Sequence, residues 1–399
     1  MGEARLYVAS LDEIRRGETA DVYFLRTKRV LEAAGLRGRR VRAELHVYSL
    51  PRGYEWGVFA GLEEALAILE GRGVNVYAVP EGTVFPPRVP LMVIEGPYYE
   101  FAELETAVLG VLRHASSIAT KAARVKMAAG DKPVLFFGLR AVHPAIAPSV
   151  DRAAYIGGVD GVAGVAAGKY LGLKPVGTMP HALIIVFGDQ REAWRAFDEY
   201  VEEDVPRIML VDTFCDEREE ALMAAKLLGE RLWGVRLDTP GSRRGNMRHI
   251  VEEVRWTLDL HGYKHVKIVV SGGLDEDKIR ELRDVADAFG VGTSIAFPPS
   301  IDISMDIVEV DYGSGFQPVT KRGKLPGAKM LYRCGPCRFV VTPWGREPPG
   351  EGCEPLLREV MRDGRIVARL PSVEEIRSAV LEQLRALEKC GGVTVEFRA

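Results

Sequence analysis

The chain has 399 residues, of which 47% are hydrophobic and 27% are charged, and its formal net charge is −3 at pH 7. This length predicts two or three domains with a large buried core, and the balanced charge argues against a nucleic-acid binder. No stretch approaches the roughly 20 apolar residues of a membrane span, and the N-terminus lacks the apolar core of a signal peptide. We therefore expect a cytoplasmic protein without a membrane partner.

Residues 1–115 have the mixed pattern of an α+β domain. Ala43–Ser49 alternates between apolar and polar side chains, as an antiparallel strand does, and Leu62–Leu69 has helical spacing. Val74–Val79 and Leu91–Glu95 are short apolar runs that we interpret as strands. Several prolines punctuate the region, so it does not continue the pattern that follows.

Two further segments of the first third stand apart. Asp21–Thr27 mixes aromatic, cationic and hydroxyl side chains in one short, loop-like stretch. Glu103–Ala129 is a long helical run that ends at Gly130, and we expect it to join two domains.

Residues 116–310 repeat a short apolar run followed at once by polar, glycine or charged residues. We count seven strands, near residues 134, 160, 175, 208, 235, 267 and 289, with an eighth expected at Ile303–Val308. Amphipathic helices are expected between them at Glu217–Gly229, Met247–Leu260 and Asp275–Ala286. This order predicts a parallel α/β barrel, whose active site is built from loops at the carboxyl ends of its strands.

The last two of these loops are rich in glycine. Ser271, Gly272 and Gly273 follow one strand, and Gly292 and Thr293 follow the next. Glycine lets backbone amides approach an anion closely, and late barrel loops often bind phosphate. Tight turns also need glycine, but its recurrence in consecutive units favours a phosphate site.

Three cationic or titratable side chains come directly after strands. Arg140 and His143 follow the first strand, and His181 follows Gly177-Thr178. The planar guanidinium of arginine suits a carboxylate or a phosphate. A surface cation and structural histidines are the alternative interpretation.

Two acidic residues also end strands. Asp212 ends one, and Asp238 ends the next, two residues after Arg236. Paired carboxylates at a barrel mouth suit magnesium on a polyphosphate, or the hydroxyls of a ribose. The alternative roles are helix capping by Asp212 and turn formation by Asp238.

Residues 311–399 are expected to form a small β-rich region with a terminal helix at Ser372–Lys389. Cys334, Cys337 and Cys353 cluster here, and the first two have zinc-knuckle spacing. Five cysteines in so long a chain do not indicate a disulfide framework, so we expect these three to bind structural Zn²⁺, with a fourth ligand unidentified. A redox pair or plain buried thiols are the alternatives.

Taken in order, these segments resemble the nicotinate phosphoribosyltransferase family, most closely its short archaeal type with a cysteine knuckle. The resemblance covers most of the chain, and its most specific segment is Gly177–Leu183. The other matching segments are 21–27, 138–148, 211–213, 236–240 and 271–275.

The resemblance implies the type II phosphoribosyltransferase fold, with residues 1–115 covering the substrate. It also implies a pentosyltransferase of NAD biosynthesis or salvage that converts nicotinate and phosphoribosyl pyrophosphate to nicotinate mononucleotide and pyrophosphate. Mg²⁺ accompanies the phosphates, and ATP hydrolysis can be coupled, which would make a ligase-type classification applicable. The family forms homodimers or higher homo-oligomers with shared active sites, to which one chain supplies Tyr23 for the barrel of another.

The resemblance and the residues together assign roles. His181 matches the histidine that is phosphorylated in related enzymes, and Arg140 is our candidate for the pyridine carboxylate. We expect His181, Arg140, Asp212 and Asp238 to be catalytic. Substrate contacts are expected from Tyr23, Arg140, His143, Thr178 and Arg236, and contacts to the 5′-phosphate from Ser271, Gly272, Gly273, Gly292 and Thr293.

Several rival functions remain open. Quinolinate phosphoribosyltransferase shares the architecture, but a dicarboxylate calls for a denser cationic cluster, and nicotinamide would make a cation at Arg140 less useful. A phosphate-binding aldolase or isomerase would need a catalytic lysine or carboxylate inside the barrel. A zinc-knuckle nucleic-acid binder conflicts with the near-neutral charge.

Overall fold

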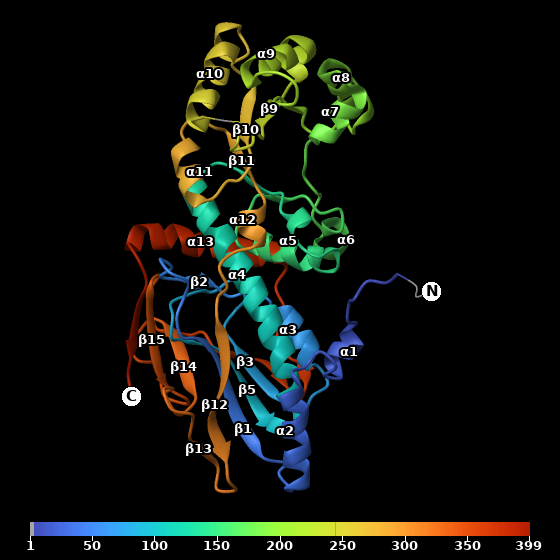
Figure 1. Cartoon of the computed structure of the whole chain (residues 1–399). Coiled ribbons are helices and arrows are strands. Elements are labelled where there is room, and N and C mark those ends of the chain that lie inside the picture. The colour runs from blue at the N-terminus through green and yellow to red at the C-terminus, as the bar shows by residue number, and fades with distance from the viewer. Residues whose placement is uncertain (1–3, 244) are drawn as a thin grey trace. The chain divides into compact units, whose positions relative to one another are not determined.

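The chain forms two compact units in a computed structural model that describes residues 4–243 and 245–399. The first, here called the terminal unit, joins the residues up to Thr120 with Pro299–Ala399, and the second, the central unit, is Lys121–Pro298. The division falls inside helix α4 (Glu105–Ala129) (Figure 1). Within the described residues, none of the helices combines the length and the hydropathy needed to cross a bilayer.

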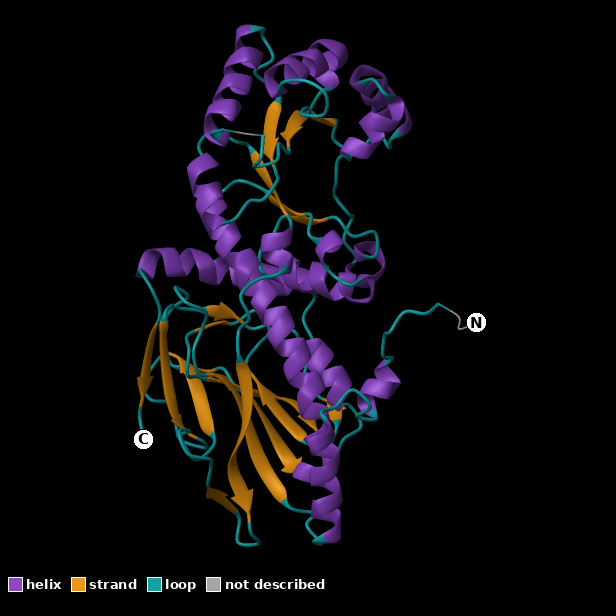
Figure 2. Ribbon diagram, in the orientation of Figure 1, coloured by secondary structure: helices purple, strands orange, loops and turns teal. Residues whose placement is uncertain are grey.

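The terminal unit is built on a seven-stranded antiparallel sheet with the order β13-β12-β1-β5-β3-β17-β18 (Figure 2). A four-stranded sheet, β16-β14-β15-β19, and the pair β2-β4 complete its strands. The strands are β1 (Arg40–Val47), β2 (Gly57–Val58), β3 (Asn75–Ala78), β4 (Val84–Phe85), β5 (Pro90–Pro97), β12 (Ile303–Asp311), β13 (Phe316–Pro318), β14 (Lys329–Arg333), β15 (Arg338–Pro343), β16 (Glu354–Pro355), β17 (Arg358–Arg362), β18 (Arg365–Ile366) and β19 (Thr394–Phe397). Its helices besides the start of α4 are α1 (Leu11–Arg15), α2 (Val22–Ala33), α3 (Leu62–Leu69) and α13 (Val373–Cys390).

One hydrophobic core joins the two ends of the chain within this unit. Leu45 of β1 and Leu66 of α3 are fully buried in the same cluster as Leu331 of β14 and Met361 of β17. Residues 311–399 are therefore not the separate region that the sequence predicts. Their strands complete the sheet and the core of the N-terminal elements.

Two predictions for this unit are wrong in their secondary structure. Ile303–Val308 is not an eighth barrel strand, because β12 pairs antiparallel with β1 and β13. A short apolar run fits either kind of sheet, and only its partners decide. Asp21–Thr27 is not a loop: helix α2 begins at Val22, with Phe24 buried and Tyr23 exposed.

The cysteines also differ from the prediction. Cys334 pairs with Cys353, and Cys337 pairs with Cys390, as two disulfides. The second joins the end of α13 to the turn before β15, a proximity that 53 residues of sequence separation hides. Thiols oxidised in pairs are not metal thiolates, so the predicted zinc site at Cys334, Cys337 and Cys353 is not formed. No group of three or more potential ligands is present in the described part of the chain.

The disulfides predict the thiol count of the purified protein. Denatured without reductant, the chain should expose one thiol, that of Cys215, and after reduction all five cysteines should react. Reduction should also lower the free energy of unfolding by about 2–5 kcal/mol per bridge, because the unfolded chain gains conformational entropy. Thiol titration and thermal melts with and without reductant measure both effects. Five reactive thiols together with stoichiometric zinc would contradict the pairing.

The central unit contains a six-stranded, wholly parallel sheet with the order β7-β6-β11-β10-β9-β8. Its strands are β6 (Val134–Phe136), β7 (Gly161–Val162), β8 (Ile208–Leu210), β9 (Gly234–Leu237), β10 (Lys267–Val270) and β11 (Ala288–Val291). Its helices besides the end of α4 are α5 (Ala147–Ile156), α6 (Ala167–Leu171), α7 (His181–Phe187), α8 (Gln190–Tyr200), α9 (Glu217–Leu228), α10 (Met247–Leu260), α11 (Glu276–Leu282) and α12 (Thr293–Ala296).

Six of the seven strands predicted for this unit are therefore present, and the segment near residue 175 is the exception. It lies beside β7, where the Val176 amide donates to the Val162 carbonyl at 2.9 Å. Pro175 has no amide hydrogen to extend a ladder. Between β7 and β8 no strand pairing closes the sheet in the described residues.

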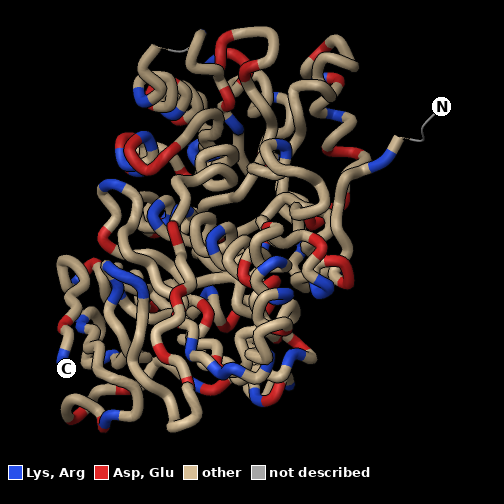
Figure 3. Tube along the Cα trace, turned by 60° about the horizontal axis from the view of Figure 1, so that its bottom comes forward, with Lys and Arg blue, Asp and Glu red and all other residues tan. Residues whose placement is uncertain are grey.

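Basic and acidic residues are interspersed along the trace of both units (Figure 3). This mixing agrees with the small net charge of −3.

Helix α5 carries a buried acid, Asp151, which is fully shielded from solvent. No partner with standard hydrogen-bond geometry reaches either carboxylate oxygen within the described residues. Burial raises the pKa of Asp151 to about 6, and the Gly164 amide opposes this in part. The close approach of this amide to Asp151 also explains why residue 164 is a glycine, since a Cβ there would lie 1.9 Å from the Asp151 Oδ2.

Asp151 should make stability depend on pH. Because its pKa is raised from 3.8 to about 6 on folding, the folded state binds the proton more tightly, and stability should fall as pH rises through this window. Asp151→Asn should therefore stabilise the protein by about 1–3 kcal/mol at pH 8 and by little at pH 4. Denaturant unfolding at both pH values measures this, and an equal effect at both would refute a charged buried Asp151.

Candidate active site

A cavity of about 880 Å³ opens within the central unit. Because parallel strands end at the same edge of their sheet, the loops after β6, β9, β10 and β11 meet there, together with the segment that enters α7. The cavity brings together ten residues predicted from the sequence: Arg140, Thr178, His181, Arg236, Asp238, Ser271, Gly272, Gly273, Gly292 and Thr293.

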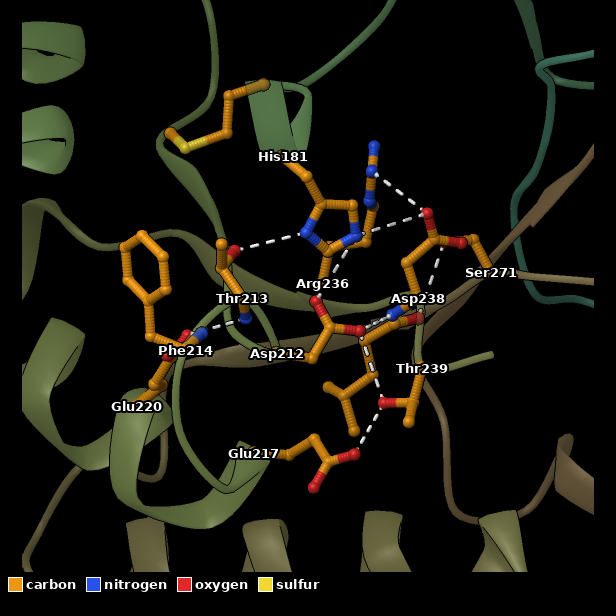
Figure 4. Close-up of polar contacts among 12 residues, drawn as sticks. His181, Asp212, Thr213, Phe214, Glu217, Glu220, Arg236, Asp238, Thr239 and Ser271 are labelled. Atoms are coloured by element: carbon orange, nitrogen blue, oxygen red, sulfur yellow. Dashed lines mark hydrogen bonds and ion pairs between the residues drawn. The ribbon is translucent and has the colours of Figure 1, made fainter. Parts of the chain in front are cut away.

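His181 is the first residue of α7, and its imidazole is polarised from both sides (Figure 4). Its Nδ1 lies 3.1 Å from the Oγ1 of Thr213. Its Nε2 faces two carboxylates, 3.7 Å from the Oδ1 of Asp212 and 3.8 Å from the Oδ2 of Asp238. The ring therefore has a hydroxyl at one nitrogen and two anions near the other.

Asp212 supports this arrangement from beneath the cavity and does not line it. Its side chain is only 2% exposed, and its Oδ2 accepts the Asp238 amide hydrogen at 2.6 Å and approaches the Thr239 hydroxyl at 3.2 Å. Burial raises the pKa of Asp212, while these contacts and His181 oppose the shift. Asp212 thus fixes the position of Asp238, and Asp238 faces the cavity.

The two arginines of the cavity differ in how they are held. The Nη1 of Arg236 donates to the Thr178 Oγ1 at 2.6 Å, and its Nη2 lies 3.5 Å from the Asp238 Oδ2. Burial lowers the pKa of Arg236, and the nearby positive charge of Arg140 adds to this effect. Arg140 is exposed and has no ion pair or hydrogen bond of its side chain in the residues described. Its guanidinium is available for an anionic ligand.

The loop after β10 brings backbone very close to Asp238. Gly272 and Gly273 both have positive φ, +87° and +63°, which favours glycine. A Cβ on Gly272 would lie 3.0 Å from the Asp238 Oδ1, the atom to which the Ser271 hydroxyl donates at 2.9 Å. Together with Gly292 and Thr293, this loop gives the cavity a wall of backbone.

Two predicted substrate contacts are not in this cavity. His143 is exposed and caps a short 3₁₀ turn, with its Nδ1 accepting from the Ala145 amide at 3.2 Å. Tyr23 belongs to the terminal unit and lines a cavity of about 300 Å³ there, with Glu105 and Asp306 among its neighbours. Burial, with Asp306 adding to it, raises the pKa of Glu105 to about 7.

Sequence reasoning missed four residues around His181. Thr213 contacts the imidazole, Glu220 holds the loop that carries Thr213, and Thr239 links Asp212 to Glu217 through contacts of 3.2 and 2.5 Å. Thr213 and Thr239 directly follow the two predicted acids and could have been proposed. The glutamates resemble ordinary acids of a helix first turn.

Family profiles match most of the chain. The profile "Quinolinate phosphoribosyl transferase, N-terminal domain" matches residues 21–116, and that of the C-terminal domain matches residues 118–306. A crystal structure described as nicotinate-nucleotide pyrophosphorylase from Pyrococcus furiosus superposes with a TM-score of 0.93 at 53% identity, covering 97% of this chain and 99% of that one. Human nicotinic acid phosphoribosyltransferase has the same fold, with a TM-score of 0.77 at 22% identity over 95% of this chain and 97% of the human one. Fold and cavity thus define a type II phosphoribosyltransferase.

The curated relatives narrow this class. A nicotinate phosphoribosyltransferase of Mycobacterium tuberculosis is 33% identical over 78% of this chain and 69% of its own length. The nicotinate phosphoribosyltransferase of Bacillus subtilis is 29% identical over 78% and 72%. The chain belongs to the nicotinate phosphoribosyltransferase family.

Proposed function

We propose that this protein joins nicotinate to phosphoribosyl pyrophosphate, forming nicotinate mononucleotide and pyrophosphate in NAD biosynthesis. The observation that carries the proposal is Arg140, an unpaired guanidinium in the same cavity as the glycine loops and His181. A guanidinium binds a carboxylate through two parallel hydrogen bonds, and nicotinate is a pyridine with one carboxylate.

The chemistry needs positioning more than proton transfer. The pyridine nitrogen already has a lone pair, so it attacks the anomeric carbon without a general base, and the bond to pyrophosphate breaks. Positive charge develops on the ribose as pyrophosphate leaves. The Asp238 carboxylate, fixed by Asp212 and Ser271, is well placed to stabilise this charge or to bind the ribose hydroxyls.

The phosphate groups have two kinds of partner. The glycine loops at Gly272-Gly273 and Gly292-Thr293 offer backbone to the 5′-phosphate. The Asp238 carboxylate faces the cavity and suits Mg²⁺ bound to the polyphosphate, with the buried Asp212 carboxylate beneath it. That ion would neutralise charge on the leaving pyrophosphate.

ATP coupling would use His181. A nucleophilic imidazole needs one nitrogen protonated and held so that the other keeps its lone pair. The two carboxylates near Nε2 and the hydroxyl at Nδ1 supply such a setting. His181 is therefore the proposed acceptor of a phosphoryl group from ATP, and this step would justify the ligase-type classification.

An aromatic contribution to the site would come from another subunit. Tyr23 is 56% exposed on α2 and could stack on the pyridine ring of a neighbouring subunit. We therefore propose a homodimer with shared active sites. Cross-linking of Tyr23→Cys to a cysteine placed at the cavity of the other subunit tests this arrangement.

One assay separates the rival substrates. Nicotinate, nicotinamide and quinolinate are each incubated with phosphoribosyl pyrophosphate and Mg²⁺, and mononucleotide formation is measured. Quinolinate is disfavoured because Arg236 is already engaged by Thr178 and Asp238, which leaves Arg140 for a single carboxylate. Turnover of quinolinate alone would overturn the assignment.

Arg140→Ala should raise the KM for nicotinate about 10- to 100-fold, the equivalent of losing one charged hydrogen-bonding partner. The KM for phosphoribosyl pyrophosphate should change far less. Steady-state kinetics with each substrate varied measure this difference between the two KM values. The control is Arg191→Ala, which removes an exposed arginine of α8. Equal effects on both substrates would remove the carboxylate role.

His181→Ala should abolish the stimulation of turnover by ATP while leaving some turnover without ATP. The comparison is the initial rate with and without ATP at saturating nicotinate. His143→Ala should keep its stimulation, because His143 caps a turn outside the cavity. Stimulation that survives in His181→Ala would exclude the phosphohistidine.

A further inference from the structure

Glu220, in the first turns of α9, is a fully buried acid whose carboxylate is turned back toward the loop that precedes its own helix. Its Oε1 accepts the amide hydrogens of Phe214 at 2.9 Å and Cys215 at 2.8 Å. Its Oε2 accepts that of Thr213 at 3.2 Å. Figure 4 shows Glu220 beside Phe214 and Thr213, with its carboxylate at the loop amides.

Three consecutive amides directed at one carboxylate restrict the backbone of that loop strongly. A buried carboxylate is costly unless hydrogen bonds compensate for its lost hydration, and here the loop between β8 and α9 supplies them. Loss of the acceptor would leave three amides to find water or other partners. The loop conformation therefore depends on Glu220.

That loop presents Thr213 to the active-site histidine. The Thr213 Oγ1 lies 3.1 Å from the His181 Nδ1, while the Asp212 and Asp238 carboxylates lie near Nε2. Carboxylates only accept hydrogen bonds, whereas a hydroxyl can donate. The favoured arrangement without a phosphoryl donor has the proton on Nε2 and the lone pair on Nδ1, to which the Thr213 hydroxyl donates.

We propose that Glu220 is a positioning residue that acts through Thr213 to set the tautomer and orientation of His181. The proposal deepens the proposed function, since it concerns the histidine that would accept a phosphoryl group. Glu220 touches no substrate. Its effect on the histidine requires the Thr213 hydroxyl, and this requirement separates it from a merely structural buried acid.

Nitrogen NMR of the protein labelled at histidine tests the tautomer without any substrate. The two ring nitrogens give different shifts when protonated and unprotonated, and His181→Ala assigns the signals. Wild type and Thr213→Ser should show a protonated Nε2 at His181. Thr213→Val and Glu220→Gln should both show mixed tautomers, and Glu219→Gln, an exposed neighbour on the same helix, should match wild type.

The outcomes are decisive in both directions. A wild-type His181 with its proton on Nδ1, or an unchanged His181 in folded Glu220→Gln, overturns the proposal. Where Glu220→Gln does not fold, Glu220→Asp keeps the charge and withdraws it by one methylene. An unchanged His181 in that folded variant counts equally against the proposal.

Kinetics supply a second, independent test. Glu220→Gln and Thr213→Val should each lower the ATP-stimulated kcat about tenfold, with a much smaller change in the KM for nicotinate. The ATP-stimulated kcat of the double variant should be no lower than that of the slower single variant, because both changes interrupt the same contact path from Glu220 to His181. Multiplied effects would mean that Glu220 acts elsewhere, and the proposal would fail.

Failure of the proposed function gives a different result. If wild type makes no nicotinate mononucleotide, the kinetic arm is void, yet the NMR arm still decides whether Glu220 sets the state of His181. If wild type is active but unaffected by ATP, the kinetic test is likewise void and the NMR test still decides. An altered histidine in Glu220→Gln then upholds the positioning role alone.

Discussion

The hydrogen bond from the Asp238 amide to the buried Asp212 carboxylate organises the whole site. Asp212 and Asp238 follow neighbouring strands, which are paired at Leu210 and Arg236. Asp238 in turn accepts from Ser271 at the end of the next strand. Three successive strand ends are thereby tied by side chains in addition to the sheet, so the carboxylate that faces the cavity has little freedom. Such preorganisation lowers the cost of stabilising charge in a transition state.

The two arginines of the cavity, Arg236 and Arg140, have different roles. Arg236 is held between Thr178 and Asp238 and balances the buried acids, at the expense of its own hydration. Arg140 contributes to the same field but has no partner in the described residues, so a ligand can satisfy it. A site with one engaged and one available guanidinium suits a monocarboxylate better than a dicarboxylate.

Much of this site could be predicted from the sequence because parallel strands place their following residues at one edge. Arg140 and Gly272 needed no coordinates beyond that rule, whereas His181 follows the segment near residue 175, which is not a strand of this sheet. Other features depend on partners distant in sequence. The run at Ile303 suits two kinds of sheet, and Cys390 meets Cys337 only after α13 has folded onto the core. The role of Glu220 could not be predicted from the sequence for another reason. An acid in the first turn of a helix is common, and only the structure shows that this one turns inward to accept from three amides.

The surroundings of His181 constrain its chemistry further. A phosphoryl group on His181, as proposed above, would place a third anion beside two carboxylates in a small space. Arg236 offsets one carboxylate at 3.5 Å, and the Asp238 amide and Thr239 hydroxyl disperse the charge of the other. The protein's own groups thus disperse part of the negative charge around His181. The Asp212 Oδ1 is buried without a hydrogen-bond partner in the described residues, so Asp238 is the carboxylate of this pair that faces the cavity.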